Sequence, residues 1–442
     1  MIAELPVLTN TRLSPKKGVS ATGVASFLLG VSFFCWAHVV IARTDFPGSP
    51  APHDVALYPS EILGLVVAML GASRLVGKHM PSRLVLIGGG MWLVASLVAT
   101  WTARDPGLAV AWIVALLVAI CVVLTGVDRS SLGKGMAVGA LGSFPVMLFQ
   151  IASQTTWPIA AIEGWQGGEL SAAVKGAAVL GDQRWLRPYG LTPHPNIAGG
   201  LAAVACVVLA AAWVRERQAW QLPVAAVAFA ETLLSFSRSA WIGALIGLAV
   251  VVVVRRGNIR PVLVAVAIPM VIFAVAFGQL ALQRTEATGT LEADSLSQRI
   301  YLVQTAVQFW RQKPLFGIGP AQFNQQEVDT YGPGFIPEPV HNAVFLVLAE
   351  TGLVGLIGAV LLVGGIAGRT KRESDWDSLA ASLAVMSPLM LDHYLLSSAV
   401  GLTLVAAVLA HDVSGRPHMG PSHKPWSRAE AIHVGRSNVY LL

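Results

Sequence analysis

Charge is scarce in this sequence: only 12% of its 442 residues are charged, about half the usual share of a soluble protein. Apolar residues make up 55% of the chain. A soluble protein cannot hide that much apolar surface, so the composition excludes an ordinary cytosolic enzyme and a disordered chain. Cysteine is equally sparse. Cys35, Cys121 and Cys206 each lie in an apolar run without a CxxC spacing, which excludes a disulfide scaffold.

Long apolar runs are abundant instead, and about 20 such residues suffice to cross a bilayer. Twelve candidate spans are expected at 20–42, 57–73, 84–101, 107–126, 135–155, 191–213, 219–236, 239–254, 261–278, 341–366, 378–391 and 395–410. The first is too long for a cleavable signal peptide and further spans follow it. Asp392-His393-Tyr394 interrupts the last apolar stretch, which could form one kinked helix or two short ones. The sequence predicts an all-α polytopic membrane protein.

Basic residues assign a side to each loop. With twelve spans, 20 of the 30 Lys and Arg residues fall on one side, while the short loops on the other side hold three. The positive-inside rule then predicts cytoplasmic tails at 1–19 and 411–442 around a transmembrane domain at 20–410. The net charge of +6 therefore reflects topology rather than nucleic-acid binding. The other basic residues lie in two long outer loops, 156–190 and 279–340, where we expect function.

The first outer loop ends in a proline-rich stretch that cannot be helical. It presents Arg184 and Arg187, followed by His194 and Asn196, where Asn196 is expected to cap the next span. Two interpretations stay open here. Either the arginines face an anion from a rigid rim, or they extend to lipid headgroups as interfacial anchors.

A second candidate is Ser237-Arg238-Ser239, at a tight outer turn between two spans. Glu231 lies seven residues earlier, two helical turns deeper on the same face. A carboxylate inside a span is costly, so it is either functional or paired. We expect Arg238 to contact a ligand, the alternative being a structural link between Arg238 and Glu231.

The long second loop contains a predicted amphipathic helix. Ser295-Leu296-Ser297-Gln298 has the form of a capping box, and apolar residues follow at helical spacing. Such a helix would lie on the membrane or cap a cavity. Arg299 then falls in the first turn, where the helix dipole disfavours a cation, unless an anion lies nearby. The alternative for Arg299 is a solvated surface position.

His341 and Asn342 open the tenth span. The positive end of the helix dipole favours the neutral imidazole of His341, which could act as a base near pH 7. The alternative is a structural role, in which His341 caps the helix or lies at the membrane interface. Glu350, nine residues on, lies on the opposite helix face, so we do not expect it to orient His341. Asp392 and His393 at the last outer turn are better placed to join an outer cluster.

No motif for a hydrolase triad or a metal is apparent. The three outer histidines, His194, His341 and His393, lack a zinc-binding spacing. The sequence predicts neither a metal nor a cofactor.

Four ordered pieces resemble the superfamily of O-antigen ligases and O-antigen polymerases, which are bacterial membrane glycosyltransferases. These pieces are Arg187 with Gly190 and His194-Pro195-Asn196, then Ser237-Arg238-Ser239, then Arg299 followed by Pro314-Leu315-Phe316-Gly317-Ile318-Gly319, then His341-Asn342 with Glu350-Thr351-Gly352. Each piece alone is weak, and the ordered set is fairly specific for the superfamily but not for one member.

The resemblance implies a GT-C-like fold in the bacterial inner membrane that requires no metal. It implies transfer of a glycan from undecaprenyl diphosphate to a sugar hydroxyl on the periplasmic side. Arg187, Arg238 and Arg299 would bind the diphosphate, whose charge grows as it leaves, and His341 would be the general base. A ligase uses lipid A-core as acceptor and a polymerase uses the growing glycan. We favour the ligase.

A different class of protein, a flippase or transporter for lipid-linked glycan, is the main competing interpretation. Transporters usually show paired halves with interrupted helices, and this sequence shows no such symmetry. Their charges should also line a path through the membrane, whereas here most charge lies at the outer rim. A non-catalytic scaffold would not need the ordered set of three arginines and a histidine.

Overall fold

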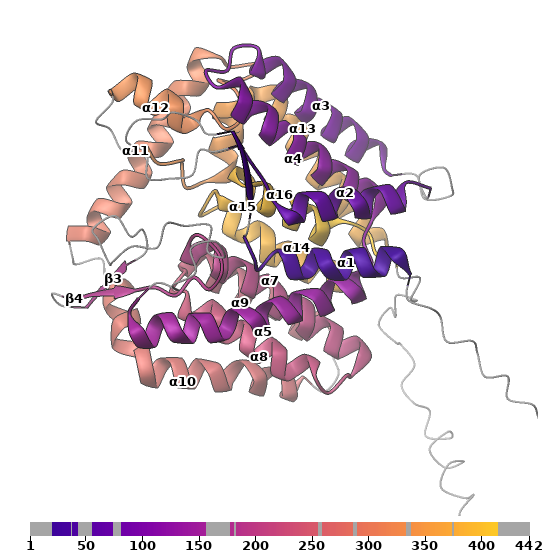
Figure 1. Cartoon of the computed structure of the whole chain (residues 1–442), viewed down its shortest axis with the longest axis vertical. Coiled ribbons are helices and arrows are strands. Elements are labelled where there is room, and N and C mark those ends of the chain that lie inside the picture. Colours follow the sequence, from indigo (N-terminus) through magenta and orange to yellow (C-terminus); the bar gives the residue numbers. More distant parts are fainter. Residues whose placement is uncertain are drawn as a thin grey trace, which may run out of the picture.

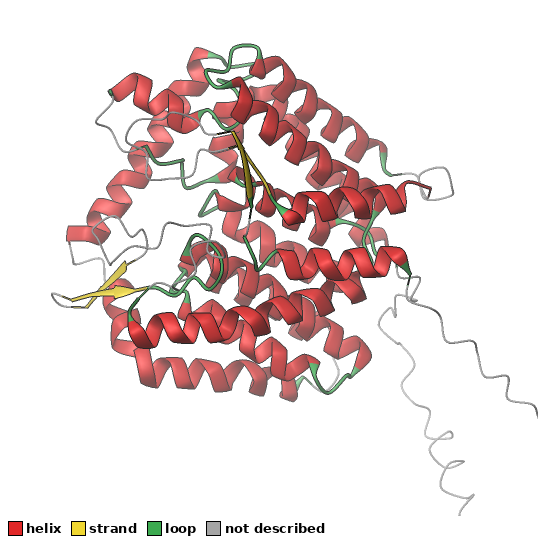
Figure 2. Cartoon of the chain, in the orientation of Figure 1, coloured by secondary structure: helices red, strands yellow, loops and turns green. Residues whose placement is uncertain are grey.

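The computed structural model describes residues 20–36, 38–42, 55–73, 81–155, 177–180, 183–254, 259–285, 290–332, 337–373 and 375–413. These residues are mostly helical (Figures 1 and 2). The helices are α1 (Ala21–Ser32), α2 (Pro59–Gly71), α3 (Arg83–Thr100), α4 (Pro106–Thr125), α5 (Arg129–Ser153), α7 (Pro195–Glu216), α8 (Gln221–Leu234), α9 (Arg238–Val254), α10 (Arg260–Thr285), α11 (Thr290–Gln312), α12 (Phe323–Tyr331), α13 (Ala343–Glu373), α14 (Trp376–Leu389), α15 (Tyr394–Ser397) and α16 (Ala399–Leu409).

Each of the twelve apolar segments expected from the sequence contains a helix. Within the described residues, six helices are long and apolar enough to cross a membrane, namely α3, α4, α5, α7, α10 and α13. Five shorter apolar helices, α1, α2, α8, α9 and α16, accompany them. The chain therefore has the character of a polytopic membrane protein, while the count of twelve spans stays a prediction.

Two short hairpins depart from the all-α expectation. Within the first expected span, 20–42, the helix ends at Ser32. The last residues of this span form the strand β1 (Val39–Ala42). This strand pairs antiparallel with β2 (Val55–Leu57). The run Val39-Val40-Ile41 is β-branched, which favours a strand over a helix. A second antiparallel hairpin, β3 (Ala177–Leu180) with β4 (Gln183–Leu186), lies in the first outer loop.

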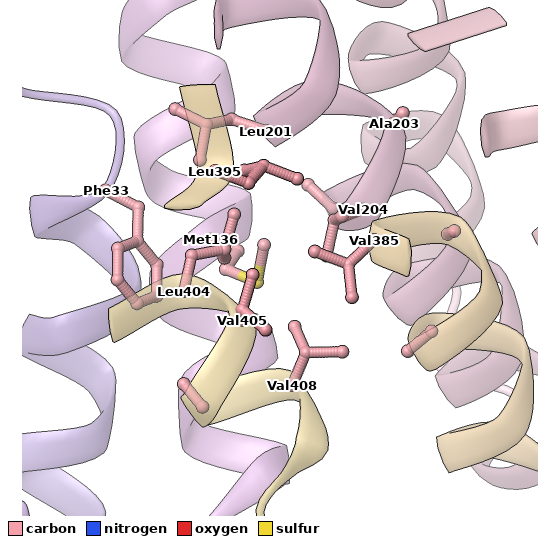
Figure 3. Packing of buried hydrophobic residues seen from close by; sticks show 14 of the residues in the cluster. Phe33, Met136, Leu201, Ala203, Val204, Val385, Leu395, Leu404, Val405 and Val408 are labelled. Carbon is pink, nitrogen blue, oxygen red and sulfur yellow. The ribbon is translucent and has the colours of Figure 1, made fainter. Parts of the chain in front are cut away.

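Helix α7 lies at the centre of the molecule and α10 at its edge. Of the most hydropathic stretch of α7, 83% is buried inside the protein, against 11% for α10. Small residues allow this close packing, because α7 carries Gly199 against Ser235 and Gly200 against Tyr394. Figure 3 shows Val204 of α7 beside Val385 of α14, and Leu395 of α15 between Leu201 and Val204. Helix α10, at the margin of Figure 1, is left to face lipid.

Helix α13 is interrupted at Gly352, and the loop Pro314-Leu315-Phe316-Gly317-Ile318 packs against the break. Gly352 adopts φ 65°, and a Cβ there would collide with the backbone of Leu315. The loop replaces the missing helix bonds, since Ile318 N donates to Ala349 O at 3.0 Å and Leu353 N donates to Pro314 O at 2.9 Å. The glycines of both segments are thus needed for close backbone approach, a use that only glycine allows.

The helix of the second outer loop begins earlier than its expected capping box. Helix α11 starts at Thr290, so Arg299 lies in the middle of the helix rather than in its first turn. The dipole argument for an anion at Arg299 therefore does not apply. Part of the apolar face of α11 packs against protein. Leu302, Ala306 and Phe309 are buried in a separate small core with Phe323 of α12 and residues that open α13.

Candidate functional site

Asp392 lies at the centre of a polar cluster formed where several helices end. It follows α14, which ends at Leu389, and the residue is 3% exposed. One carboxylate oxygen accepts from His341 Nδ1 at 3.4 Å and from the backbone N of His393 at 2.8 Å. The other accepts from the amide of Asn196 at 2.7 Å. The interruption of the last apolar stretch therefore separates two helices, α14 and α16, and brings a carboxylate to the site.

Arg187 joins the same cluster through Asn196. Its Nη2 donates to Asn196 Oδ1 at 2.7 Å and its Nε donates to the carbonyl of Ser235 at 3.0 Å. Arg187 is only 4% exposed, so its side chain is buried within the protein and does not extend to lipid headgroups as an interfacial anchor. Asn196, expected to cap α7, instead lies inside its first turn and bridges Arg187 to Asp392, so a continuous chain of hydrogen bonds runs from Arg187 to His341.

His341 is charged at neutral pH, which corrects the expectation of a neutral imidazole. Burial lowers its pKa, but the hydrogen bonds to Asp392 and Glu338 outweigh burial and raise the pKa to about 9. Its Nε2 lies 3.8 Å from Glu338 Oε2. The positive charge of Arg299 opposes this rise, which places Arg299 within electrostatic reach of His341. Close carboxylates thus outweigh the dipole of α13, because an opposite charge at such range is the stronger effect.

Asp392 itself is held in the ionised form. Burial raises the pKa of Asp392, but the hydrogen bond with His341 and the charges of His393 and His341 lower it well below its usual range. His393 completes this side of the cluster. Its ring centroid lies 5.3 Å from that of His341, and its Nδ1 bonds to the hydroxyl of Ser397 at 2.8 Å.

His194 has a structural position. It is the N-cap of α7, where its Nδ1 accepts from the backbone N of Asn196 at 3.1 Å. Burial, reinforced by the charge of Arg187, lowers the pKa of His194 to about 3, so this imidazole is neutral. The neutral ring thus holds the backbone of Asn196 at the start of α7.

The other two arginines predicted to bind a ligand, Arg238 and Arg299, are partly exposed. Arg238 is the first residue of α9. Its neighbours Ser237 and Ser239 are buried and bonded to each other through their hydroxyls at 3.1 Å. Arg299 projects from α11 and is partly exposed. Partial exposure of both guanidinium groups suits contact with a ligand better than a purely structural position would.

The remaining predicted residues divide into structural supports and residues without a described side chain. Asn342 caps α13, accepting from Val344 N at 3.0 Å. Glu350, as expected, does not contact His341. It accepts from the backbone of Phe323 at 3.1 Å and so fixes α12. Glu231 is buried beside Ser143 of α5. The side chain of Arg184, in β4, lies outside the described residues.

One group of potential metal ligands occurs among the described residues. His341, Asp392 and His393 each offer a ligand atom, and these atoms lie within 4.8 Å of one another. Zinc could be held by such a set, though a fourth ligand would come from water or substrate. The expectation that this site requires no metal stays a prediction.

Sequence reasoning missed how tightly the outer loop segment is tied down. The backbone N of Glu338 donates to Glu327 Oε2 at 2.9 Å, and Glu327 is fully buried. Burial raises the pKa of Glu327 to about 8. Glu338 in turn accepts from Gln298 of α11 at 2.9 Å. The signal available in the sequence was the Pro337-Glu338-Pro339 stretch, which is rigid and places a carboxylate three residues before His341.

The assembled geometry offers cations, an ionised carboxylate and an imidazole at one end of the helical bundle. Such a set can bind a strongly anionic group and move a proton beside it. Residues 223–360 match the family model described as O-antigen ligase. That range includes Arg238, Arg299 and His341 together with the interlocked break in α13. No curated protein matches the chain. Residues 223–360 of this chain are therefore similar to the O-antigen ligase family.

Proposed function

We propose that the chain is a membrane glycosyltransferase that moves a glycan from undecaprenyl diphosphate to a sugar hydroxyl of lipid A-core. The reaction would take place at the periplasmic face of the bacterial inner membrane. The match of residues 223–360 to the O-antigen ligase family supports the general activity, and the description of the matched model as a ligase favours lipid A-core as acceptor.

The observation that carries the proposal is the chain of hydrogen bonds from Arg187 through Asn196 and Asp392 to His341. It fixes a cation for the leaving group and an imidazole for the attacking group in one rigid unit. Pre-organisation of this kind lowers the barrier, since the groups need no rearrangement as charge develops.

Arg187, Arg238 and Arg299 bind the diphosphate of the donor in this account. As the bond between the sugar and the diphosphate oxygen breaks, the diphosphate gains negative charge. Guanidinium groups form short, charge-assisted hydrogen bonds with phosphate oxygens and stabilise that charge. Partial exposure of Arg238 and Arg299 leaves them accessible to such a ligand.

His341 is the general base. The hydroxyl oxygen of the acceptor attacks the anomeric carbon, the bond to the diphosphate breaks, and the hydroxyl proton passes to Nε2 of the neutral imidazole. Asp392 holds Nδ1–H and thereby fixes the ring, which makes Asp392 a positioning residue. With a pKa of about 9, roughly one imidazole in a hundred is neutral at pH 7, so catalysis must speed up as the pH rises.

A reconstitution experiment tests the proposed function and its acceptor. The purified chain is placed in liposomes with undecaprenyl-diphosphate-linked glycan and either lipid A-core or a second lipid-linked glycan, without nucleotide or ion gradient. We expect a new glycosidic linkage to lipid A-core. A linkage formed only between two glycans would make the protein a polymerase. Movement of the donor between leaflets without any linkage would make it a flippase and overturn the proposal.

A further inference from the structure

Two histidines and a carboxylate converge at the proposed site from separate segments of the chain. Their nearest ring nitrogens are Nδ1 of His341 and Nε2 of His393, which lie 3.4 Å and 3.9 Å from the same oxygen, Oδ1 of Asp392. Taken one from each residue, the ligand atoms of this cluster all lie within 4.8 Å of one another. The proposed transfer reaction needs one imidazole as a base, so it leaves the second imidazole beside Asp392 without a role.

The separations in this cluster are close to those of a metal site. Zinc binds imidazole nitrogen at about 2.0–2.1 Å and carboxylate oxygen at about 2.0–2.2 Å in tetrahedral geometry, which places neighbouring ligand atoms about 3.4 Å apart. The distance from His341 to Asp392 already has this value. The distance of 3.9 Å from His393 to Asp392 has to shorten by only about half an ångström. A rotation of the two partly exposed rings would close the set.

Each imidazole also has a partner on its outer nitrogen. Nδ1 of His393 bonds to the hydroxyl of Ser397 at 2.8 Å, and when Nδ1–H is the donor the lone pair of Nε2 is left for a metal. Nε2 of His341 faces the carboxylate of Glu338 at 3.8 Å. Histidines that bind metals almost always have such a partner on the second nitrogen, because it fixes the tautomer and orients the ring.

The two nitrogens can be reached from water. The side chains of His341 and His393 are 24% and 17% exposed, whereas that of Asp392 is 4% exposed. A metal ion can therefore approach the imidazoles from the aqueous phase and meet the buried carboxylate behind them. Water or a substrate oxygen would supply the fourth ligand, as at zinc sites with three protein ligands.

The chemistry of the ligands selects the metal and limits its affinity. Two imidazoles and one carboxylate suit zinc, whereas Mg²⁺ and Ca²⁺ prefer sets made of oxygen alone. Arg299 lies within electrostatic reach of His341, and Arg187 is joined to Asp392 through Asn196. Both cations oppose a dication, and the protein supplies three ligands rather than four. We therefore expect reversible binding that a strong chelator can undo, unlike the binding at a structural zinc site.

We propose that His341, Asp392 and His393 bind a zinc ion that switches the transferase off, an inference that rests on the proposed function for its effect on the rate. Zinc coordinates Nδ1 of His341 and displaces the proton on that nitrogen to water. The remaining ring proton stays on Nε2, which then has no lone pair to accept the proton of the acceptor hydroxyl. The metal-free chain is the active one.

The first measurement is of binding and needs no enzymatic activity. The full chain is purified in detergent through a tag without histidine, stripped with EDTA, exchanged into buffer without chelator and titrated with Zn²⁺ against a fluorescent zinc indicator. We expect one zinc per chain. Ser397→Ala should weaken the affinity about 10–100-fold, the usual effect of removing the partner of a metal-binding histidine. His393→Ala removes a ligand and should weaken the affinity further.

His38→Ala is the matched control for binding. The ring of His38 is also partly exposed, but it packs beside Tyr58 and does not belong to the group of potential ligands. This variant should bind zinc as the unmodified chain does.

The second measurement is the rate of glycan transfer in proteoliposomes with and without saturating Zn²⁺. We expect the unmodified chain to slow by about 10²–10⁴-fold, the contribution of a general base, and to recover in excess EDTA. The low rate of His341→Ala should not fall further, because the nitrogen that zinc blocks is already absent. His393→Ala should keep its own metal-free rate at a zinc concentration that inhibits the unmodified chain. Mg²⁺ at the same concentration should change nothing.

Several outcomes would overturn the proposal. They are the absence of stoichiometric zinc binding, an affinity unchanged in both Ser397→Ala and His393→Ala, equal inhibition of His393→Ala and the unmodified chain, and bound zinc that leaves the rate unchanged or raises it. A chain that binds zinc as expected but makes no product even without zinc would support the metal site and overturn the proposed function instead.

Discussion

Both ends of α7 lie near clusters of charged side chains, but the two clusters differ in net charge. Near Asn196, the cations Arg187, His341 and Arg299 accompany the carboxylates Asp392 and Glu338, and the excess is positive. Near Glu216, the cations Arg129, Arg215 and Lys134 accompany the carboxylates Asp375, Glu216 and Asp377. An unbalanced buried charge is costly, so it persists where a ligand of opposite charge supplies the balance. The positive excess supports our proposal that a diphosphate binds at the Asn196 end.

We expect the largest loss of activity when His341, near the Asn196 end of α7, is replaced. His341→Ala removes the proposed base, and general base catalysis typically contributes 10²–10⁴-fold in rate. We expect glycan transfer to fall by about that factor, measured in proteoliposomes, while donor binding and the fold persist. His393→Ala should cost far less, because the His393 ring bonds to Ser397. Near-normal turnover of His341→Ala would remove the base role.

Exchange of arginines at the two ends should show which end binds the donor. Arg187→Lys keeps the charge but loses the planar guanidinium, and one or two charge-assisted hydrogen bonds are worth about 1.5–3 kcal/mol each. We expect binding of undecaprenyl diphosphate to weaken about 10–100-fold. Arg215→Lys, at the opposite end of α7, is the matched control and should leave donor affinity unchanged. Equal affinities in both variants would contradict the assignment of Arg187.

The pH dependence tests the protonation state of His341. Its pKa of about 9 means that the base form is scarce at pH 7 and grows as the pH rises. We expect the transfer rate to increase about tenfold per pH unit from pH 6 and to level off near pH 9. Asp392→Asn removes the carboxylate that raises this pKa, so its plateau should begin at lower pH. Asp377→Asn, at the other end, should not move the profile.

A rate that stays flat below pH 9 and falls above it would show that the protonated form of His341 is the active one. In that case His341 would stabilise the leaving diphosphate, and the base would have to be another group.

The break in α13 should matter for stability more than for chemistry. Gly352→Ala forces a Cβ against the backbone of Leu315 at a positive φ, a strain that costs about 1–3 kcal/mol. We expect a lower Tm in detergent. Gly364→Ala lies in the same helix, where nothing lies within 4 Å of the added Cβ, and should be neutral. If the two variants had the same Tm, the contact between Gly352 and the backbone of Leu315 would not stabilise the fold.

The smallest expected effect is that of a chelator. We expect EDTA to leave the transfer rate unchanged, because hydrogen bonds between His341 and Asp392 already satisfy the cluster. A loss of rate that added zinc restores would instead show that His341, Asp392 and His393 hold a metal that transfer requires.

Apolar length was sufficient to predict where the apolar helices lie, because burial in lipid imposes a strong local pattern, but it did not predict the polar helix α12. It failed for Val39–Ala42, where β-branched residues pair with a strand that comes 13 residues later, a contact that no local pattern encodes. The predicted capping box placed the start of α11 too late. The true start at Thr290 moved Arg299 to the middle of the helix.

The candidate site was predictable in its members and not in its connections. Asp392 drew attention as a carboxylate between apolar runs, and His341 as a histidine at a helix start. That Asp392 bridges His341 to Asn196 depends on three segments far apart in the sequence. The raised pKa of His341 follows from that bridge, so the helix dipole alone gave the wrong sign. Likewise, the close approach of Gly317 to the backbone of Glu350, and of Gly352 to the backbone of Leu315, joins segments that no local pattern connects.

The most direct test of the central claim is to count products in liposomes that contain only the purified chain, undecaprenyl-diphosphate-linked glycan and lipid A-core. We expect one undecaprenyl diphosphate to be released for each new glycosidic linkage, and we expect His341→Ala to form both products about 10²–10⁴-fold more slowly. Linkage formed without release of undecaprenyl diphosphate, or equal product from His341→Ala, would contradict that claim.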